Sequence, residues 1–137
     1  MPEPSARTPP VERFFSQNLE CVPQAANEAR CLAAAALNEW DLTQLLDDVR
    51  LVMTELVSNA VAHAAGSGVL VSIVLLDEQR VRINVLDQDR KRPEPRPLDV
   101  EQERGRGLLL VQVLASLWGV DLLPGGKSVW AELEVPT

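Results

Sequence analysis

One stretch of this chain decides its fold, and it reads Glu55-Leu56-Val57-Ser58-Asn59-Ala60-Val61-Ala62-His63-Ala64. Its apolar residues continue a stripe with helical spacing that begins at Leu45 and passes through Val49 and Val52, which predicts a long, half-buried helix. Glu55 and Asn59 stand four residues apart, so a helix projects both side chains from one face. A carboxylate and a carboxamide one turn apart suit a ligand site. An ordinary amphipathic helix with a wet polar face has the same pattern.

A second stretch, Gly105-Arg106-Gly107-Leu108, opens another apolar segment. We expect this segment to be a deeply packed helix from Leu108 to Trp118. Glycines allow close approach of a ligand to the backbone. The first N–H groups of a helix have no partner within it, so together with the helix dipole and Arg106 they can hold a phosphate. A hinge before a helix has the same pattern, but the two stretches together predict a nucleotide site between two helices.

The composition is that of one globular domain, with 137 residues of which 46% are hydrophobic. We expect a flexible, proline-rich leader at residues 1–10 and a single domain at residues 11–137. No apolar run is long enough to span a membrane, and the N-terminus lacks the pattern of a signal peptide. We therefore expect a cytoplasmic protein that does not bind membranes. The net charge of −7 argues against direct binding to nucleic acid, because phosphate neutralisation needs a basic surface.

The other elements follow from periodicity and turn signals. We expect strands at Val11–Leu19, Val69–Leu76, Arg80–Asp87, Val120–Leu123 and Ser128–Val135, a helix from Pro23 to Leu37 closed by Trp40 and Asp41, and a cap at Thr43 for the helix that carries Glu55. The connection between the second and third strands is short enough to require an antiparallel hairpin. The order predicts a two-layer α+β sandwich, with a mostly antiparallel sheet covered on one face by helices.

Asp87 ends the strand in which Val81, Ile83 and Val85 alternate with polar residues. Period two places its carboxylate on the apolar face of the strand, where it needs a partner. One interpretation is that Asp87 accepts a hydrogen bond from a purine amino group at the base of a pocket. The other is that it caps the loop that follows.

These motifs, in this order, resemble those of the GHKL (Bergerat-fold) ATPases, and specifically the anti-sigma-factor serine/threonine kinases. The resemblance runs from about Val11 to Val135. The stretch that begins at Glu55 resembles the N-box of the family. By that resemblance Asn59 is the ligand of Mg²⁺ and Glu55 is the general base.

The remaining motifs of the family are matched in turn. Val85-Leu86-Asp87 resembles the start of the first glycine box, which implies that Asp87 reads adenine. Gly105-Arg106-Gly107-Leu108 resembles the second glycine box and implies that Gly105, Arg106, Gly107 and Leu108 contact the phosphates. Gly126-Lys127-Ser128-Val129-Trp130 resembles the last box, with Ser128 where the family usually has a threonine near the adenine.

The chain departs from the family pattern in two places. The first box commonly continues as D-x-G-x-G, whereas Asp87-Gln88-Asp89-Arg90-Lys91 contains no glycine. Strict alternation also places Ser128 on the face opposite Val129, Ala131 and Leu133, so its assigned role requires a strand that begins after it.

The resemblance implies an anti-sigma regulatory factor with Mg-ATP-dependent protein serine/threonine kinase activity. Its implied cofactors are ATP and Mg²⁺, and its implied partners are a sigma factor, a STAS-type anti-sigma antagonist and a second copy of the chain in a homodimer. The glycine-free segment after Asp87 motivates an alternative, a noncatalytic module that binds a sigma factor or an antagonist with degenerate or lost nucleotide binding.

Overall fold

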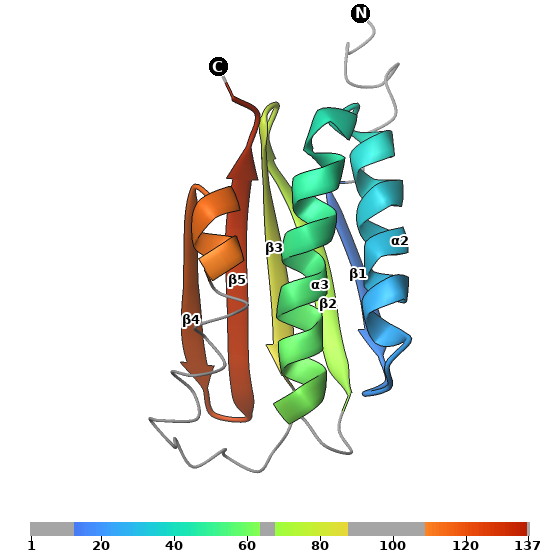
Figure 1. Ribbon diagram of the computed structural model, residues 1–137, viewed down its shortest axis with the longest axis vertical. Coiled ribbons are helices and arrows are strands. Elements are labelled where there is room, and N and C mark those ends of the chain that lie inside the picture. The colour runs from blue at the N-terminus through green and yellow to red at the C-terminus, as the bar shows by residue number, and fades with distance from the viewer. Residues whose placement is uncertain (1–12, 64–67, 88–108, 137) are drawn as a thin grey trace, which may run out of the picture.

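The computed structural model describes residues 13–63, 68–87 and 109–136, and it shows helices packed on one face of an antiparallel sheet (Figure 1). In chain order the elements are β1 (Phe14–Leu19), α2 (Ala25–Glu39), the short 3₁₀ helix η1 (Thr43–Leu45), α3 (Leu46–His63), β2 (Val69–Asp77), β3 (Arg80–Asp87), β4 (Leu117–Leu123) and β5 (Gly126–Glu134). Residues 109–114 form a further short helix before β4. The predicted two-layer α+β sandwich is confirmed.

Two observations bear on the expectations about the ends and about membranes. The expected leader at residues 1–10 lies outside the described residues. None of the helices in the described ranges is long and apolar enough to cross a membrane.

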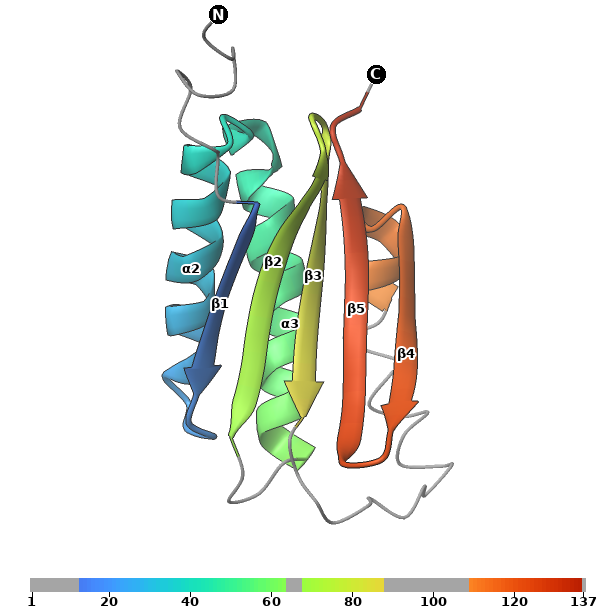
Figure 2. The same ribbon diagram turned by 180° about the vertical axis from the view of Figure 1, so that it is seen from behind.

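The sheet has the strand order β1-β2-β3-β5-β4, and each neighbouring pair is antiparallel. The first strand is therefore at one edge, and β4 is at the other. The predicted hairpin β2–β3 is present, and β4 and β5 form a second hairpin. Figure 2 shows the opposite face of the sheet, over which none of the described helices lies.

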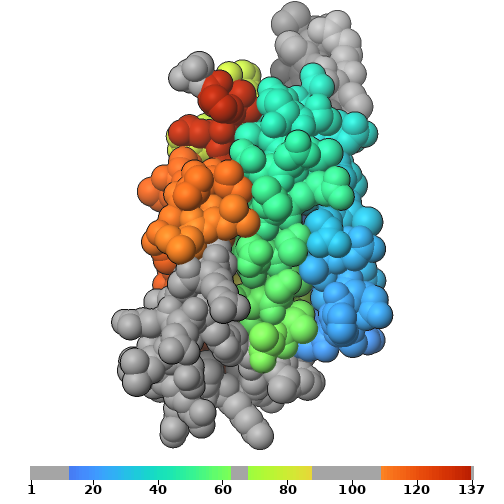
Figure 3. Space-filling view, viewed as in Figure 1, coloured from blue at the N-terminus to red at the C-terminus, as the bar shows by residue number. Residues whose placement is uncertain are grey.

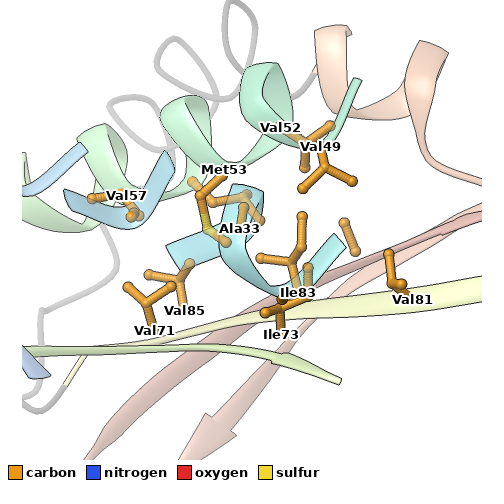
Figure 4. Close-up of a cluster of buried hydrophobic side chains, with 14 of the residues drawn as sticks. Ala33, Val49, Val52, Met53, Val57, Val71, Ile73, Val81, Ile83 and Val85 are labelled. Carbon is orange, nitrogen blue, oxygen red and sulfur yellow. The ribbon is translucent and has the colours of Figure 1, made fainter. Parts of the chain in front are cut away.

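The core lies between α3 and the central strands (Figure 4). Val81, Ile83 and Val85 of β3 alternate with more exposed residues and are buried, as period two predicts. The buried stripe of α3 packs on them, because its apolar residues recur at helical spacing. The residues of α2 that are buried are mostly small, namely Ala25, Ala29, Ala33, Ala36 and Leu37. Small side chains let α2 approach the layer closely.

α2 ends in a backbone motif rather than in a side-chain cap. Asp41 adopts a φ of 55°, in the left-handed region. The N–H of Leu42 donates to the carbonyl of Leu37 at 2.8 Å, and the N–H of Asp41 donates to that of Asn38 at 3.3 Å, which is the Schellman pattern. Thr43, predicted to cap α3, is instead the first residue of η1. The prediction of a Thr43 cap was wrong because this turn already joins the two helices.

The third helix is shorter than predicted, because residues 117–119 belong to β4. The N–H of Ser116 donates to the carbonyl of Glu132 in β5 at 2.8 Å. This N–H is therefore bonded to the sheet, whereas in a longer helix it would bond within the helix. The expected deep packing was also wrong. Val111 is fully buried, but Leu109 is 59% and Val113 78% exposed.

Gly119 explains how β4 fits beside β5. A Cβ at Gly119 would lie 2.7 Å from the Trp130 ring, so the absence of a side chain makes room for the indole. The guanidinium of Arg82 lies 4.1 Å from the centroid of the same ring, on the face that the helices leave open. The β4–β5 pairing thus depends on Gly119, which directly follows the segment that the sequence predicted to be helical up to Trp118.

Both ends of the described chain are bound to the β2–β3 hairpin. The N–H of Leu75 donates to the carbonyl of Arg13 at 2.9 Å, and the N–H of Val135 donates to that of Gln79 at the same distance. We call this the hairpin end of the sheet. The opposite end, where β3 terminates, is called the Asp87 end.

Candidate functional site

Glu55 and Asn59 lie on the flank of α3 that faces away from α2. Arg30 of α2 donates a hydrogen bond to Thr54 Oγ1 at 3.0 Å, which identifies the opposite flank. Successive residues of a helix are rotated by about 100°, so the side chain of Glu55 points about 100° away from that of Thr54. Asn59 lies on the same flank as Glu55, one turn later. Both side chains are half-buried. The helix at residues 109–114 lies on the side of α3 that faces away from α2 (Figures 1 and 3).

Asp87 lies at the end of β3 on the face that the helices cover, as predicted, and only 3% of its surface is exposed. In Figure 4 Val57 of α3 lies over Val85, and both elements run on toward the Asp87 end. Two residues of strand and one turn of helix advance by similar lengths, about 6.6 and 5.4 Å. Asp87 and the last turns of α3 therefore lie at the same end of the domain.

The pairing of β3 with β5 decides which residue stands beside Asp87. Asp87 is opposite Lys127, and Leu86 is opposite Ser128. Cross-strand partners lie on the same face of a sheet, so Lys127 accompanies Asp87 on the covered face and Ser128 lies on the other. The assigned role of Ser128 requires a strand that begins after it, but β5 begins at Gly126. That requirement is not met.

The phosphate side of the predicted site falls outside the described residues. This applies to Gly105, Arg106, Gly107 and Leu108, and also to the glycine-free run at 88–91. The helix at residues 109–114 follows directly. Within the described residues, Glu55 and Asn59 thus lie on one flank of α3, and Asp87 lies on the covered face of the sheet with Lys127 opposite it on β5.

Asn59 offers an oxygen of the kind that Mg²⁺ takes together with phosphate oxygens. Among the described residues, no group of three or more His, Cys, Asp or Glu side chains gathers in a way that would hold a metal ion. Mg²⁺ commonly keeps several waters and takes one or two protein oxygens together with phosphate oxygens. The half-buried carboxamide of Asn59 can supply one such oxygen, so the site fits Mg²⁺ bound with phosphates.

A separate cleft of about 290 Å³ lies between the start of α2 and the end of α3. It is lined by Val22, Pro23, Ala26, Ser58, Val61 and Ala62. Ser58 and Val61 belong to the α2 side of α3, so the cleft is on the other flank from Glu55 and Asn59. Sequence reasoning did not identify this cleft. It included Lys127 in the last box but did not place it beside Asp87, because that position depends on the register of β5 with β3.

Comparison with solved structures finds the same fold elsewhere. The crystal structure of the RsbU and RsbW domains of Rv1364c from Mycobacterium tuberculosis matches with a TM-score of 0.63 and 19% sequence identity. The match covers 90% of this chain and 32% of that chain, so this chain spans about a third of the length of the chain that it matches. At this identity the likeness concerns the fold alone. No curated protein matches the sequence significantly.

Comparison with protein families gives a match over nearly the whole chain. Residues 15–133 match the family described as the histidine kinase-like ATPase domain. The matched range begins in β1, ends in β5 and contains Glu55, Asn59, Asp87 and Lys127. This chain therefore belongs to the family of histidine kinase-like ATPase domains.

Proposed function

We propose that this domain is an anti-sigma regulatory factor that binds Mg-ATP and phosphorylates a serine or threonine of a STAS-type antagonist protein. One observation carries the proposal. Asp87, which is only 3% exposed, ends β3 on the face of the sheet that the helices cover, at the same end of the domain as the last turns of α3. Membership of an ATPase-domain family supports an ATP site at this place.

Each group has a defined role in this proposal. Asp87 accepts a hydrogen bond from the exocyclic amino group of adenine, and the N–H groups around Gly105–Leu108 hold the phosphates. Asn59 offers its carboxamide oxygen to Mg²⁺. The ion, when bound, neutralises charge on the phosphates.

Glu55 accepts the proton of the attacking hydroxyl. As that oxygen bonds to the γ-phosphorus, the bond from the γ-phosphorus to the β–γ bridging oxygen breaks. ADP is then released, and the antagonist carries a phosphate monoester. Glu55 is suited to this role because its half-buried carboxylate is accessible one turn from Asn59.

The proposed partners are a sigma factor, the antagonist and a second copy of the chain in a homodimer, all in the cytoplasm. Support comes from the RsbW domain in the protein with the same fold. In that protein the RsbW domain occurs together with an RsbU domain. The partners of this chain are therefore part of the proposal.

The first prediction concerns Glu55→Ala. We expect the variant to bind Mg-ATP like the wild type, because Glu55 does not contact the base. Phosphate transfer should fall by about 10²–10⁴-fold, the usual contribution of a general base. The measurement is transfer of labelled γ-phosphate to a purified STAS-type antagonist, with calorimetry for binding.

Ser58→Ala is the matched control, because Ser58 lies on the same helix but lines the cleft on the α2 side. It should transfer phosphate at the wild-type rate. Transfer that survives in Glu55→Ala would remove Glu55 from its role as the base.

A noncatalytic module that binds a sigma factor or an antagonist is the second candidate. Lys127, which stands opposite the buried Asp87, supports it together with the glycine-free run at residues 87–91, because both depart from the expected adenine pocket. Calorimetry with millimolar Mg-ATP separates the two functions. Absence of both heat and thermal stabilisation would favour the module.

A further inference from the structure

One row of cross-strand partners crosses the whole sheet at the Asp87 end. From β1 to β4 it consists of Leu19, Val69, Asp87, Lys127 and Leu122. Burial decreases along this row. Leu19, Val69 and Asp87 are at most 3% exposed, Lys127 is half-buried, and Leu122 is 85% exposed. The row is therefore buried at its β1 side and exposed at its β4 side, and Lys127 lies between these two parts.

Asp87 has one apolar and one cationic neighbour across the ladders, Val69 on β2 and Lys127 on β5. Directly opposed residues on one face have Cβ atoms about 4.5–5.5 Å apart. The lysine side chain is long enough for its ammonium to reach any group that binds the carboxylate of Asp87. A ligand that reaches Asp87 from the exposed β4 side of the row would therefore meet the carboxylate as an acceptor and the ammonium as a donor.

The two purines differ in the edge that they present to such a pair. Adenine offers its N6 amino group to a carboxylate, and its neighbouring ring nitrogen N1 is an acceptor. Guanine offers two donors, N1–H and the N2 amino group, and next to them the acceptor O6. A carboxylate alone repels O6, whereas an ammonium donates to it and cannot accept.

We propose that Lys127 is a second base-contacting residue and that the Asp87–Lys127 pair makes the site accept guanine nucleotides as well as adenine nucleotides. Asp87 accepts hydrogen bonds from N1–H and the N2 amino group of guanine, and Lys127 donates to O6. With adenine, Asp87 accepts from N6. This inference rests on the proposed nucleotide site and adds its base specificity.

The test is calorimetric titration of the wild type and of Lys127→Met with Mg-GTP and Mg-ATP. Methionine keeps the length of the side chain and removes its charge and its donors. We expect wild-type affinities for the two nucleotides within about tenfold of each other. In Lys127→Met the affinity for GTP should fall at least about tenfold relative to that for ATP, the size of effect that a base-specific polar contact usually has.

Two further variants complete the test. Lys127→Arg should bind GTP as the wild type does, because it keeps a cationic donor at this position. Ser128→Ala should leave the ratio of the two affinities unchanged, because Ser128 lies on the other face. Retained ATP binding in Lys127→Met also shows that the variant folds.

Several outcomes would overturn the inference. An affinity ratio that stays within twofold in Lys127→Met would do so while leaving the proposed function intact. Nucleotide binding that appears only after Lys127 is replaced would make Lys127 an obstruction rather than a contact. If none of the proteins binds either nucleotide, the proposed function fails and the inference fails with it.

Discussion

At the scale of single residues, sequence reasoning placed Asp87 correctly on the covered face of the sheet. It assigned the position near the base to Ser128, whereas the residue opposite Asp87 is Lys127. Alternation within β3 is a local property, so the covered position of Asp87 could be predicted from four residues. The choice between Lys127 and Ser128 depends on where β5 begins and on its register with β3. Register is set by pairing between residues forty positions apart, which no local pattern contains.

Asp41 carries backbone strain that can be tested directly. Its φ of 55° is costly for an L-residue, by about 1–2 kcal/mol, although Asp tolerates this region better than most. We expect Asp41→Gly to stabilise the domain by about 0.5–1 kcal/mol, since relief of strain exceeds the entropy that glycine adds to the unfolded chain. Urea denaturation measures the difference.

Asp41→Ala is the matched control, because it keeps the strain and removes the polar side chain. It should be less stable than the wild type. A glycine variant that is also less stable than the wild type would show that the Asp41 side chain contributes more than its strain removes.

At the scale of elements, the long amphipathic helix and the hairpin strands were predictable, and the third helix was only partly so. In α3 apolar and polar residues alternate at a helical period, so its buried face is marked. Residues 108–118 are apolar nearly all round, and periodicity cannot locate the end of such a segment. Its end is set by Glu132, whose carbonyl accepts from Ser116.

The β4–β5 pairing yields a prediction about Gly119. An alanine Cβ there would lie 2.7 Å from the Trp130 ring, so Gly119→Ala should displace the indole from Arg82. We expect a loss of about 1–3 kcal/mol in the free energy of unfolding, the usual effect of overpacking. Urea denaturation followed by tryptophan fluorescence measures it.

Gly125→Ala is the control, because nothing lies within 4 Å of a Cβ at that position in the neighbouring turn. It should change stability little. In a double-mutant cycle, Gly119→Ala should cost less free energy of unfolding in the Trp130→Val variant than in the wild type, since the clash disappears. If Gly119→Ala costs the same in both backgrounds, the contact with Trp130 is not the cause.

At the scale of the whole molecule, the proposed site joins both layers, because Asn59 comes from the helices and Asp87 from the sheet. A ligand that contacts both should stabilise the complete domain. At Mg-ATP concentrations 100 times the Kd, we expect about 2.7 kcal/mol of stabilisation, or a rise in Tm of about 10 °C. Differential scanning fluorimetry measures the shift.

Asp87→Asn is the informative comparison, because it keeps the size of the side chain and weakens its acceptor character. The shift with Mg-ATP should shrink strongly. A shift as large as that of the wild type would place the nucleotide elsewhere in the chain.

The position of Arg13 and Val135 at the hairpin end has a practical consequence. Both are bound to one hairpin, whereas Asp87 lies seven residues further along β3, about 23 Å away. A tag, a fused domain or a surface attached beyond either position is therefore anchored at the end of the sheet opposite Asp87. We expect that immobilisation through either terminus leaves the proposed nucleotide site accessible in biosensor measurements.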